Sequence, residues 1–162
     1  MTLVVPYDGS ELSKTALIRA AQFDTVFEQG VVAAAVVPRN NSSYARTKGW
    51  IGPDESFDRD VIVESLREAV AGIAPKAAFK HLSVGRNAPA GTIANTLRKF
   101  ARDRQASIVF IGSENAGRMV GSLSVGSSVS AEQSYDTMII SQARPTKIKE
   151  LEDAVSTEAA IE

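Results

Sequence analysis

The most constraining feature of the chain is the segment 107–111, Ser-Ile-Val-Phe-Ile, which ends at Gly112 and is followed by a polar loop rich in glycine. An apolar run of this kind, partly β-branched, is typical of a parallel strand buried on both faces. Loops after such strands bind anions through main-chain N–H groups, because glycine allows close approach and a following helix adds partial positive charge. A plain strand-to-helix turn has the same pattern, so the loop indicates a ligand-binding site only if a second strand elsewhere in the chain ends in a similar polar loop.

The amino terminus supplies that partner. An apolar strand over 3–7 ends in Asp8-Gly9-Ser10, and an amphipathic helix begins at once, capped by Asp8 or Ser10. The helix carries apolar residues at the spacing of one buried face: Leu12, Ala16, Ala20 and Phe23. Two strand ends that open into small polar loops suit an open α/β sheet, in which ligands lie outside the carboxyl ends of the strands.

The rest of the chain alternates between strand and helix patterns. Further strands are predicted over 30–37, 77–84 and 136–141, and the mixed polarity of 77–84 is typical of an edge strand. Helical spacing is found over 62–73, over 93–101 and, in the last helix, over about 122–133. This alternation predicts an α/β fold with an open five-stranded parallel sheet and helices on both faces.

Two segments fall outside the alternation. Residues 38–53 are predicted to be an irregular insert, in which Trp50 and Ile51 anchor a long loop to the body of the protein. From Ala143 onward the sequence becomes polar and acidic, as in a solvated tail or a loosely docked helix. We therefore expect one α/β domain over 1–142 and a tail over 143–162.

Composition narrows the classes of function. The chain has 162 residues, a net charge of −1 and no cysteine, and its basic residues form no run or aromatic-lined platform. These features predict no nucleic-acid partner, and the absence of cysteine fits a reducing compartment. No apolar run approaches the length of a membrane span, so we expect a cytoplasmic protein without direct membrane insertion.

Three elements together resemble the universal stress protein family. They are Val5-Pro6-Tyr7-Asp8-Gly9-Ser10-Glu11, the segment 106–113 and the later pair Gly126-Ser127, in the family's order over about residues 2–142. The resemblance implies the strand order 3-2-1-4-5, related to Rossmann-like nucleotide-binding folds. First and fourth strands would then be neighbours, and Asp8 and Gly112 would meet in one crevice. It also implies a homodimer that pairs through the strand 137–141, an apolar edge that would otherwise be unpaired; the alternative is that the tail over 143–162 covers this edge.

The resemblance further implies an adenine-nucleotide site for ATP or AMP. Pro6, Tyr7 and Asp8 would lie beside the ribose and base, and Val36 against the adenine. The phosphates would be surrounded by Gly112, Asn115, Gly126, Ser127 and Ser128. Nucleotide-binding members place glycine where this chain has Asn115, with nine residues before the Gly-Ser pair, whereas here ten residues intervene. Asparagine tolerates positive φ, but the extra residue disturbs the convergence of N–H groups, so the site is predicted to be weak or degenerate.

No catalytic or metal-binding residue is predicted. His81 is the only histidine, and the serines between 122 and 130 lack the Gly-x-Ser-x-Gly pattern of a nucleophile. The leading interpretation is a non-enzymatic regulatory module of the stress response. One alternative is an interaction domain for a transporter or signalling partner that binds no nucleotide. Another is a nucleotide-hydrolysing enzyme, against which stands the lack of a Gly-x-x-x-x-Gly-Lys-[Ser/Thr] loop.

Overall fold

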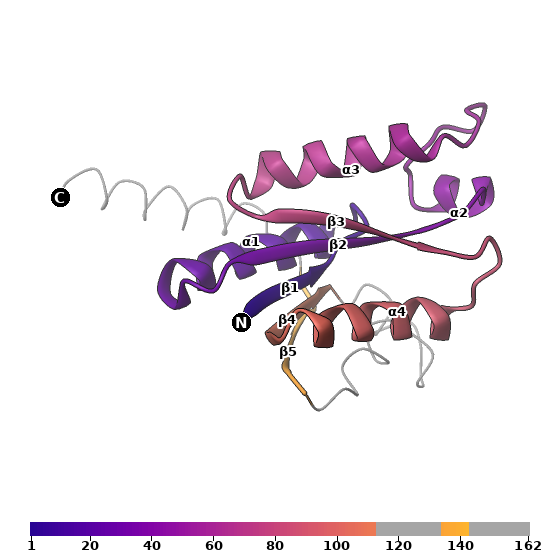
Figure 1. Cartoon of the computed structure of the whole chain (residues 1–162). Helices are drawn as coiled ribbons and strands as arrows, with labels where there is room; N and C mark the ends of the chain where they lie inside the picture. Colours follow the sequence, from indigo (N-terminus) through magenta and orange to yellow (C-terminus); the bar gives the residue numbers. More distant parts are fainter. Residues whose placement is uncertain (113–133, 143–162) are drawn as a thin grey trace.

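The computed structural model describes residues 1–112 and 134–142. Within them, helices and strands alternate much as the sequence predicts, and Figure 1 shows their arrangement. In chain order they are β1 (Thr2–Pro6), α1 (Glu11–Phe27), β2 (Val31–Pro38), α2 (Ser42–Thr47), α3 (Arg59–Ile73), β3 (Ala78–Val84), α4 (Ala90–Asp103), β4 (Ala106–Gly112) and β5 (Asp136–Ile140). The predicted helix over 122–133 and the tail over 143–162 lie outside the described residues.

The five strands form one parallel sheet in the order β3-β2-β1-β4-β5. Both the predicted fold class and the order implied by the family resemblance are therefore confirmed. Strand β3 lies at an edge, as its mixed polarity indicated, and β5 lies at the opposite edge. Because β1 and β4 are parallel neighbours, with Val4 opposite Val109, their carboxyl ends point to the same edge of the sheet.

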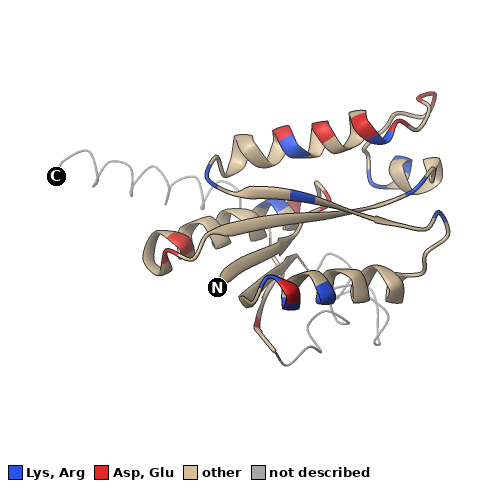
Figure 2. Cartoon of the chain, in the orientation of Figure 1, with Lys and Arg blue, Asp and Glu red and all other residues tan. Residues whose placement is uncertain are grey.

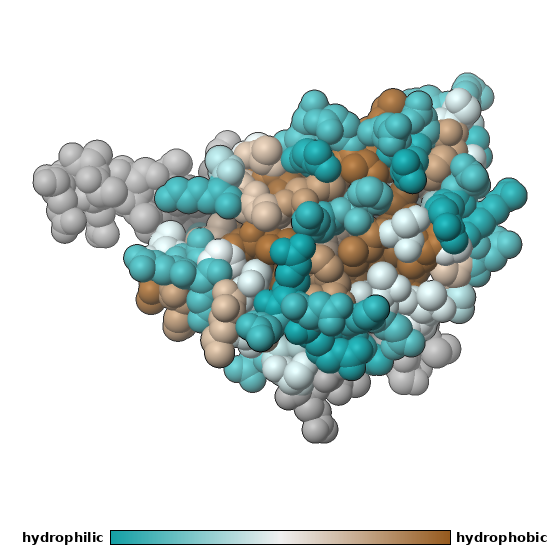
Figure 3. Space-filling model, viewed as in Figure 1, coloured by the Kyte–Doolittle hydropathy of each residue, from teal (hydrophilic) through white to brown (hydrophobic). Residues whose placement is uncertain are grey.

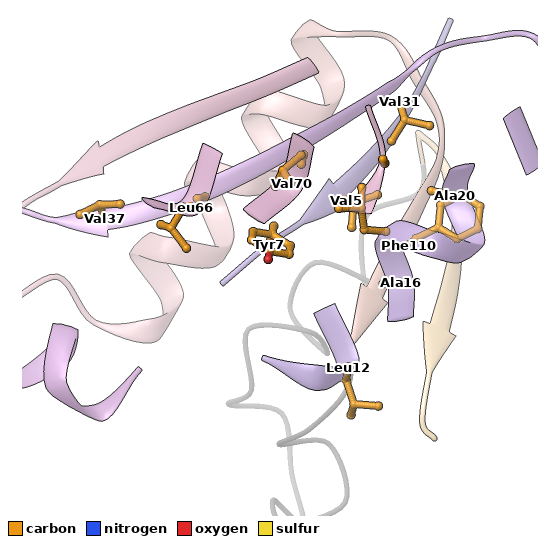
Figure 4. Close-up of a cluster of buried hydrophobic side chains, with 14 of the residues drawn as sticks. Val5, Tyr7, Leu12, Ala16, Ala20, Val31, Val37, Leu66, Val70 and Phe110 are labelled. Carbon is orange, nitrogen blue, oxygen red and sulfur yellow. The ribbon is translucent and has the colours of Figure 1, made fainter. Parts of the chain in front are cut away.

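Helices cover both faces of the sheet and create two separate cores. On one face, α1 and α3 pack over a cluster that contains the fully buried Phe110, and Figure 4 shows this cluster with Val5 and Leu66 among its members. On the other face, α4 contributes Ile93 and Leu97 to a second cluster. Burial on both faces explains why β2 and β4 read as nearly continuous apolar runs instead of alternating patterns.

Helix α1 begins where the sequence predicted, and Ser10 is the residue that caps it. The Ser10 side chain accepts a hydrogen bond from the main-chain N–H of Ser13. Gly9 makes the turn from β1 into the helix with a φ of +83°, a conformation that residues with a Cβ rarely adopt. Asp8 also supports this turn, because its Oδ1 accepts a hydrogen bond from the N–H of the capping residue Ser10.

The insert over 38–53 is not wholly irregular, and that prediction was wrong in part. It contains the short helix α2, capped by Asn41, whose side-chain oxygen accepts a hydrogen bond 2.9 Å long from the N–H of Tyr44. A six-residue helix is too short to reveal a 3.6-residue period, so its polar residues were indistinguishable from a loop. The predicted anchor is present, because Ile51 is buried and Trp50 packs partly buried against the first core.

Acidic and basic residues are mixed along α3, and Figure 2 shows both kinds interspersed on this helix. Figure 3 shows hydrophobic side chains between the polar surfaces of α3 and α4, along the edge formed by β3. Among the described helices, none has the length and hydrophobicity that crossing a membrane would require.

Candidate functional site

The carboxyl end of β4 is pressed against the start of helix α1. A Cβ added at Gly112 would lie 2.6 Å from the carbonyl carbon of Leu12 and 2.8 Å from the amide nitrogen of Ser13. Both neighbours are main-chain atoms, so neither can swing aside as a flexible side chain would. Glycine at this position is therefore required for the close approach of strand and helix, whatever further role the loop has.

Asp8, just beyond the carboxyl end of β1, is held by three residues. Its Oδ1 accepts a hydrogen bond from the N–H of Ser10 at 3.0 Å, and its Oδ2 pairs with Lys48 Nζ at 2.7 Å. Its main-chain carbonyl accepts a bond from the indole Nε1–H of Trp50 at 2.8 Å. The segment that contains α2 is thus attached to the candidate site by one ion pair and one hydrogen bond.

These contacts set the charge of Asp8. Burial alone would raise the pKa of its carboxyl, but the ammonium of Lys48 and the hydrogen bonds from Lys48 and Ser10 outweigh burial and lower the pKa to about 2. Asp8 is therefore ionised at neutral pH. Lys48 also lies 5.5 Å from the centre of the Tyr44 ring, so an aromatic face adds to its surroundings.

Tyr7 and Val36 lie on opposite faces of the sheet. The Tyr7 ring is 2% exposed and packs in the core under α1 and α3, whereas Val36 belongs to the cluster on the α4 face. The Tyr7 hydroxyl is buried and finds no hydrogen-bond partner among the described residues. Burial, followed by the nearby charges of Asp8 and Glu11, raises the pKa of Tyr7 to about 12, so the phenol stays protonated.

The structure therefore brings only some of the predicted site residues together. Pro6 at the end of β1, Asp8 and Gly112 come to one edge of the sheet, with the Tyr7 backbone between the first two. The side chains of Tyr7 and Val36 do not line a common surface. The remaining predicted residues, Asn115, Gly126, Ser127 and Ser128, lie outside the described residues.

The described residues offer little for metal or histidine chemistry. In the two ranges 1–112 and 134–142 no cluster of three or more histidine, cysteine, aspartate or glutamate side chains is arranged to hold a metal ion. His81 lies half-buried on the edge strand β3, at the other side of β2 from Asp8. A cavity of about 710 Å³ opens at the amino end of the sheet, bounded by Asp24, Ile73 and Lys76, and none of the predicted site residues lines it.

The sequence matches the model of the Universal stress protein family over residues 1–140. The chain belongs to the universal stress protein family. No curated protein sequence matches it significantly. The family assignment agrees with the Asp-Gly-Ser and Gly-Ser elements and with the observed strand order.

Solved structures of other universal stress proteins share the fold. One from Archaeoglobus fulgidus superposes with a TM-score of 0.59 at 19% identity, covering 87% of this chain and 93% of the other. A universal stress protein in complex with cAMP gives 0.56 at 20% identity, covering 89% and 98%. The Archaeoglobus fulgidus protein in complex with dAMP gives 0.56 at 17% identity, covering 86% and 96%.

Sequence reasoning missed two residues at the candidate site. Lys48 was not singled out, because a lysine in a polar segment carries no signal that it will meet Asp8, 40 positions earlier. Trp50 was identified as an anchor, but not as a donor to the carbonyl of Asp8. A buried indole N–H needs an acceptor, and this is the one signal that pointed from the insert toward the polar strand ends.

Proposed function

We propose that the chain is a regulatory universal stress protein without catalytic activity that binds ATP or AMP weakly at the carboxyl ends of β1, β2 and β4. The observation that carries the proposal is the neighbouring position of two strand ends, with Asp8 just after β1 and Gly112 closing β4. Relatives of the same fold are described in complex with cAMP and with dAMP, which supports an adenine nucleotide as the ligand class.

The carboxylate of Asp8 fits the role of acceptor for a ribose hydroxyl. Its oxygens offer about four acceptor positions, and one bond to Ser10 and one to Lys48 use two of them. The main chain at Pro6 and Tyr7 and the side chain of Val36 would contact the base. The phosphates would be bound by the N–H groups from Gly112 onward, including Asn115, Gly126, Ser127 and Ser128.

Mass spectrometry of small molecules released from gently purified, denatured protein tests the ligand class directly. Calorimetry then measures affinity, which we expect to be micromolar or weaker, because the loss of two converging N–H donors costs roughly 1–3 kcal/mol. Asp8→Ala and Gly126→Val should weaken binding, and deletion of one residue between Asn115 and Gly126 should strengthen it. Binding unchanged in both substitutions would place the ligand elsewhere, and steady hydrolysis abolished by Asp8→Ala would contradict a non-catalytic role.

We also propose a cytoplasmic homodimer that pairs through residues 137–141. Strand β5 is an edge of the sheet, and Ile139 on it is 49% exposed. Exposed apolar edge strands are a liability unless they are paired or covered. Light scattering at micromolar concentration tests this proposal, and a purely monomeric sample would contradict it.

One observation favours a second candidate, an interaction domain for a transporter or signalling partner that binds no nucleotide. Asp8 already has a cationic partner in Lys48, so the site is electrostatically satisfied within the chain. Under this second candidate, neither the released-molecule analysis nor calorimetry with ATP, AMP and adenosine would detect a ligand.

A further inference from the structure

The proposed nucleotide site would bring negative charges of the protein and the ligand close together. A phosphate monoester carries a charge of about −2 at neutral pH. The carboxylate that would receive the ribose, Asp8, is itself ionised. Glu11, in the first turn of α1, already pairs with Lys14 at 3.3 Å, so Asp8 is the carboxylate whose charge still has to be balanced. An ionised carboxylate beside an anionic ligand repels it, so an anionic nucleotide needs a compensating cation next to Asp8.

Lys48 is placed to be that cation. Its Nζ lies 2.7 Å from Asp8 Oδ2, and the two side chains are 27% and 32% exposed. This burial is enough to reduce solvent screening, while the ammonium is still open to solvent on part of its surface. The hydrogen bond from Trp50 to the Asp8 carbonyl ties the end of the same segment to the strand end, which keeps the ammonium near the site.

We propose that Lys48 is the specificity residue that makes this site prefer phosphorylated adenine nucleotides to uncharged adenosine. The inference rests on the proposed nucleotide-binding function. Lys48 neutralises Asp8 without using all of its acceptor positions, so the carboxylate still accepts a ribose hydroxyl. Its charge then offsets the repulsion that a phosphate would meet at this edge. Lys48 thus contributes to the binding of ATP and AMP and little to the binding of adenosine.

The test compares ATP, AMP and adenosine on the full-length protein by calorimetry at low salt. Lys48→Met removes the charge and keeps an unbranched side chain, and Lys48→Arg keeps the charge. The matched control is Lys76→Met, which makes the same change in net charge at the exposed amino end of β3, at the opposite edge of the sheet. Thermal unfolding of each variant establishes that it is folded.

We expect Lys48→Met to weaken ATP binding by about tenfold and adenosine binding by less than about twofold, with AMP between them. Lys48→Arg should retain the preference, and Lys76→Met should leave all three affinities within about twofold. Added salt should reduce ATP affinity less in Lys48→Met than in the wild type.

Three results would overturn the inference while leaving nucleotide binding intact. Equal losses for ATP and adenosine would make Lys48 only a support for the α2 segment. Unchanged affinities would remove it from the site, and tighter ATP binding in Lys48→Met would make it a competitor for Asp8. Wild-type protein that binds none of the three ligands would instead contradict the proposed function itself, and this inference with it. If Lys48→Met does not fold, a loss of the ATP preference in Lys48→Gln decides the question in the same way.

Discussion

Two strand ends meet at the carboxyl edge of the sheet, and different forces hold them. The end of β4 is fixed by shape, since Gly112 lies against main-chain atoms of Leu12 and Ser13. The end of β1 is fixed by charge and hydrogen bonds, since Asp8 is held by Ser10, Lys48 and Trp50. A steric fit between backbones has one solution. Polar contacts at a partly exposed carboxylate can be shared with a ligand, so the β1 end is the adaptable half of the site.

The largest expected effect is on the sterically fixed end. Gly112→Ala places a Cβ within 2.8 Å of two backbone atoms, so strand or helix must move. We expect the free energy of unfolding to fall by about 2–3 kcal/mol, near the upper part of the range for overpacked cores. Urea unfolding followed by circular dichroism measures the change.

Gly91→Ala is the matched control for that substitution. Gly91 lies in the first turn of α4, where an added Cβ meets nothing within 4 Å. The same chemical change should there stabilise the protein by about 0.4–1 kcal/mol, because alanine restricts the unfolded chain. If both substitutions changed stability equally, the close packing of Gly112 against α1 would not control the β4 end.

The second effect concerns the hydrogen bond from Trp50 to the carbonyl of Asp8. Trp50→Phe keeps an aromatic ring against Tyr44, 5.6 Å away between centroids, but removes the Nε1–H donor. Leaving the carbonyl without its donor should lower the free energy of unfolding by about 1–2 kcal/mol. Chemical unfolding measures it, with Phe57→Leu as a control for apolar packing in the same region. A loss no larger than that of the control would show that only the ring matters.

The sheet itself was predictable from sequence because a strand that is buried on both faces consists almost entirely of apolar residues. The apolar runs 30–37 and 107–111 correspond to β2 and β4 within one residue at each end. The role of Gly112 was predictable only in part. Its place at a strand end suggested contact with a phosphate, whereas its fit against helix α1 depends on how two elements pack, and periodicity does not encode that distance.

The β1 end of the candidate site, which is held by polar contacts, was much less predictable. Asp8 was identified from its Asp-Gly-Ser context, but its partner Lys48 is the C-cap residue of a short helix within a polar insert. For Tyr7 and Val36, sequence position was also insufficient. Both were assigned to the nucleotide, yet the alternation of side chains along neighbouring strands places them on opposite faces of the sheet. The sequence indicates at which end of a strand a residue lies, but only the pairing register of the strands shows on which face of the sheet its side chain lies.

A third effect should be seen in acid. The folded-state pKa of Asp8 is about 2, below the value of 3.8 for an unperturbed aspartate. A lowered pKa means that the ionised carboxyl stabilises the folded state above about pH 4, and that this contribution disappears as the pH falls to about 2. Because the ion pair is partly exposed, we expect about 1 kcal/mol.

Comparison with Asp8→Asn isolates this contribution from the other carboxylates. The difference in unfolding free energy between wild type and Asp8→Asn should be constant above about pH 4 and should shrink between about pH 4 and pH 2. Unfolding curves at a series of pH values measure it. A difference that does not vary with pH would show that the Asp8 carboxyl titrates alike in the folded and unfolded chain.

The smallest expected effect is the stability change from Lys48→Met at neutral pH without ligand. Partly exposed ion pairs contribute about 0.5 kcal/mol, and methionine keeps an unbranched apolar side chain in place of the lysine stem. The loss should shrink further in 1 M salt, where the Debye length falls to about 3 Å. Denaturant unfolding at low and high salt measures both values, with the exposed pair of Lys14 and Glu11 as reference through Lys14→Met. A loss above about 2 kcal/mol that salt leaves unchanged would mean that Lys48 is a structural support of the β1 end, and the contrast between a rigid β4 end and an adaptable β1 end would fail.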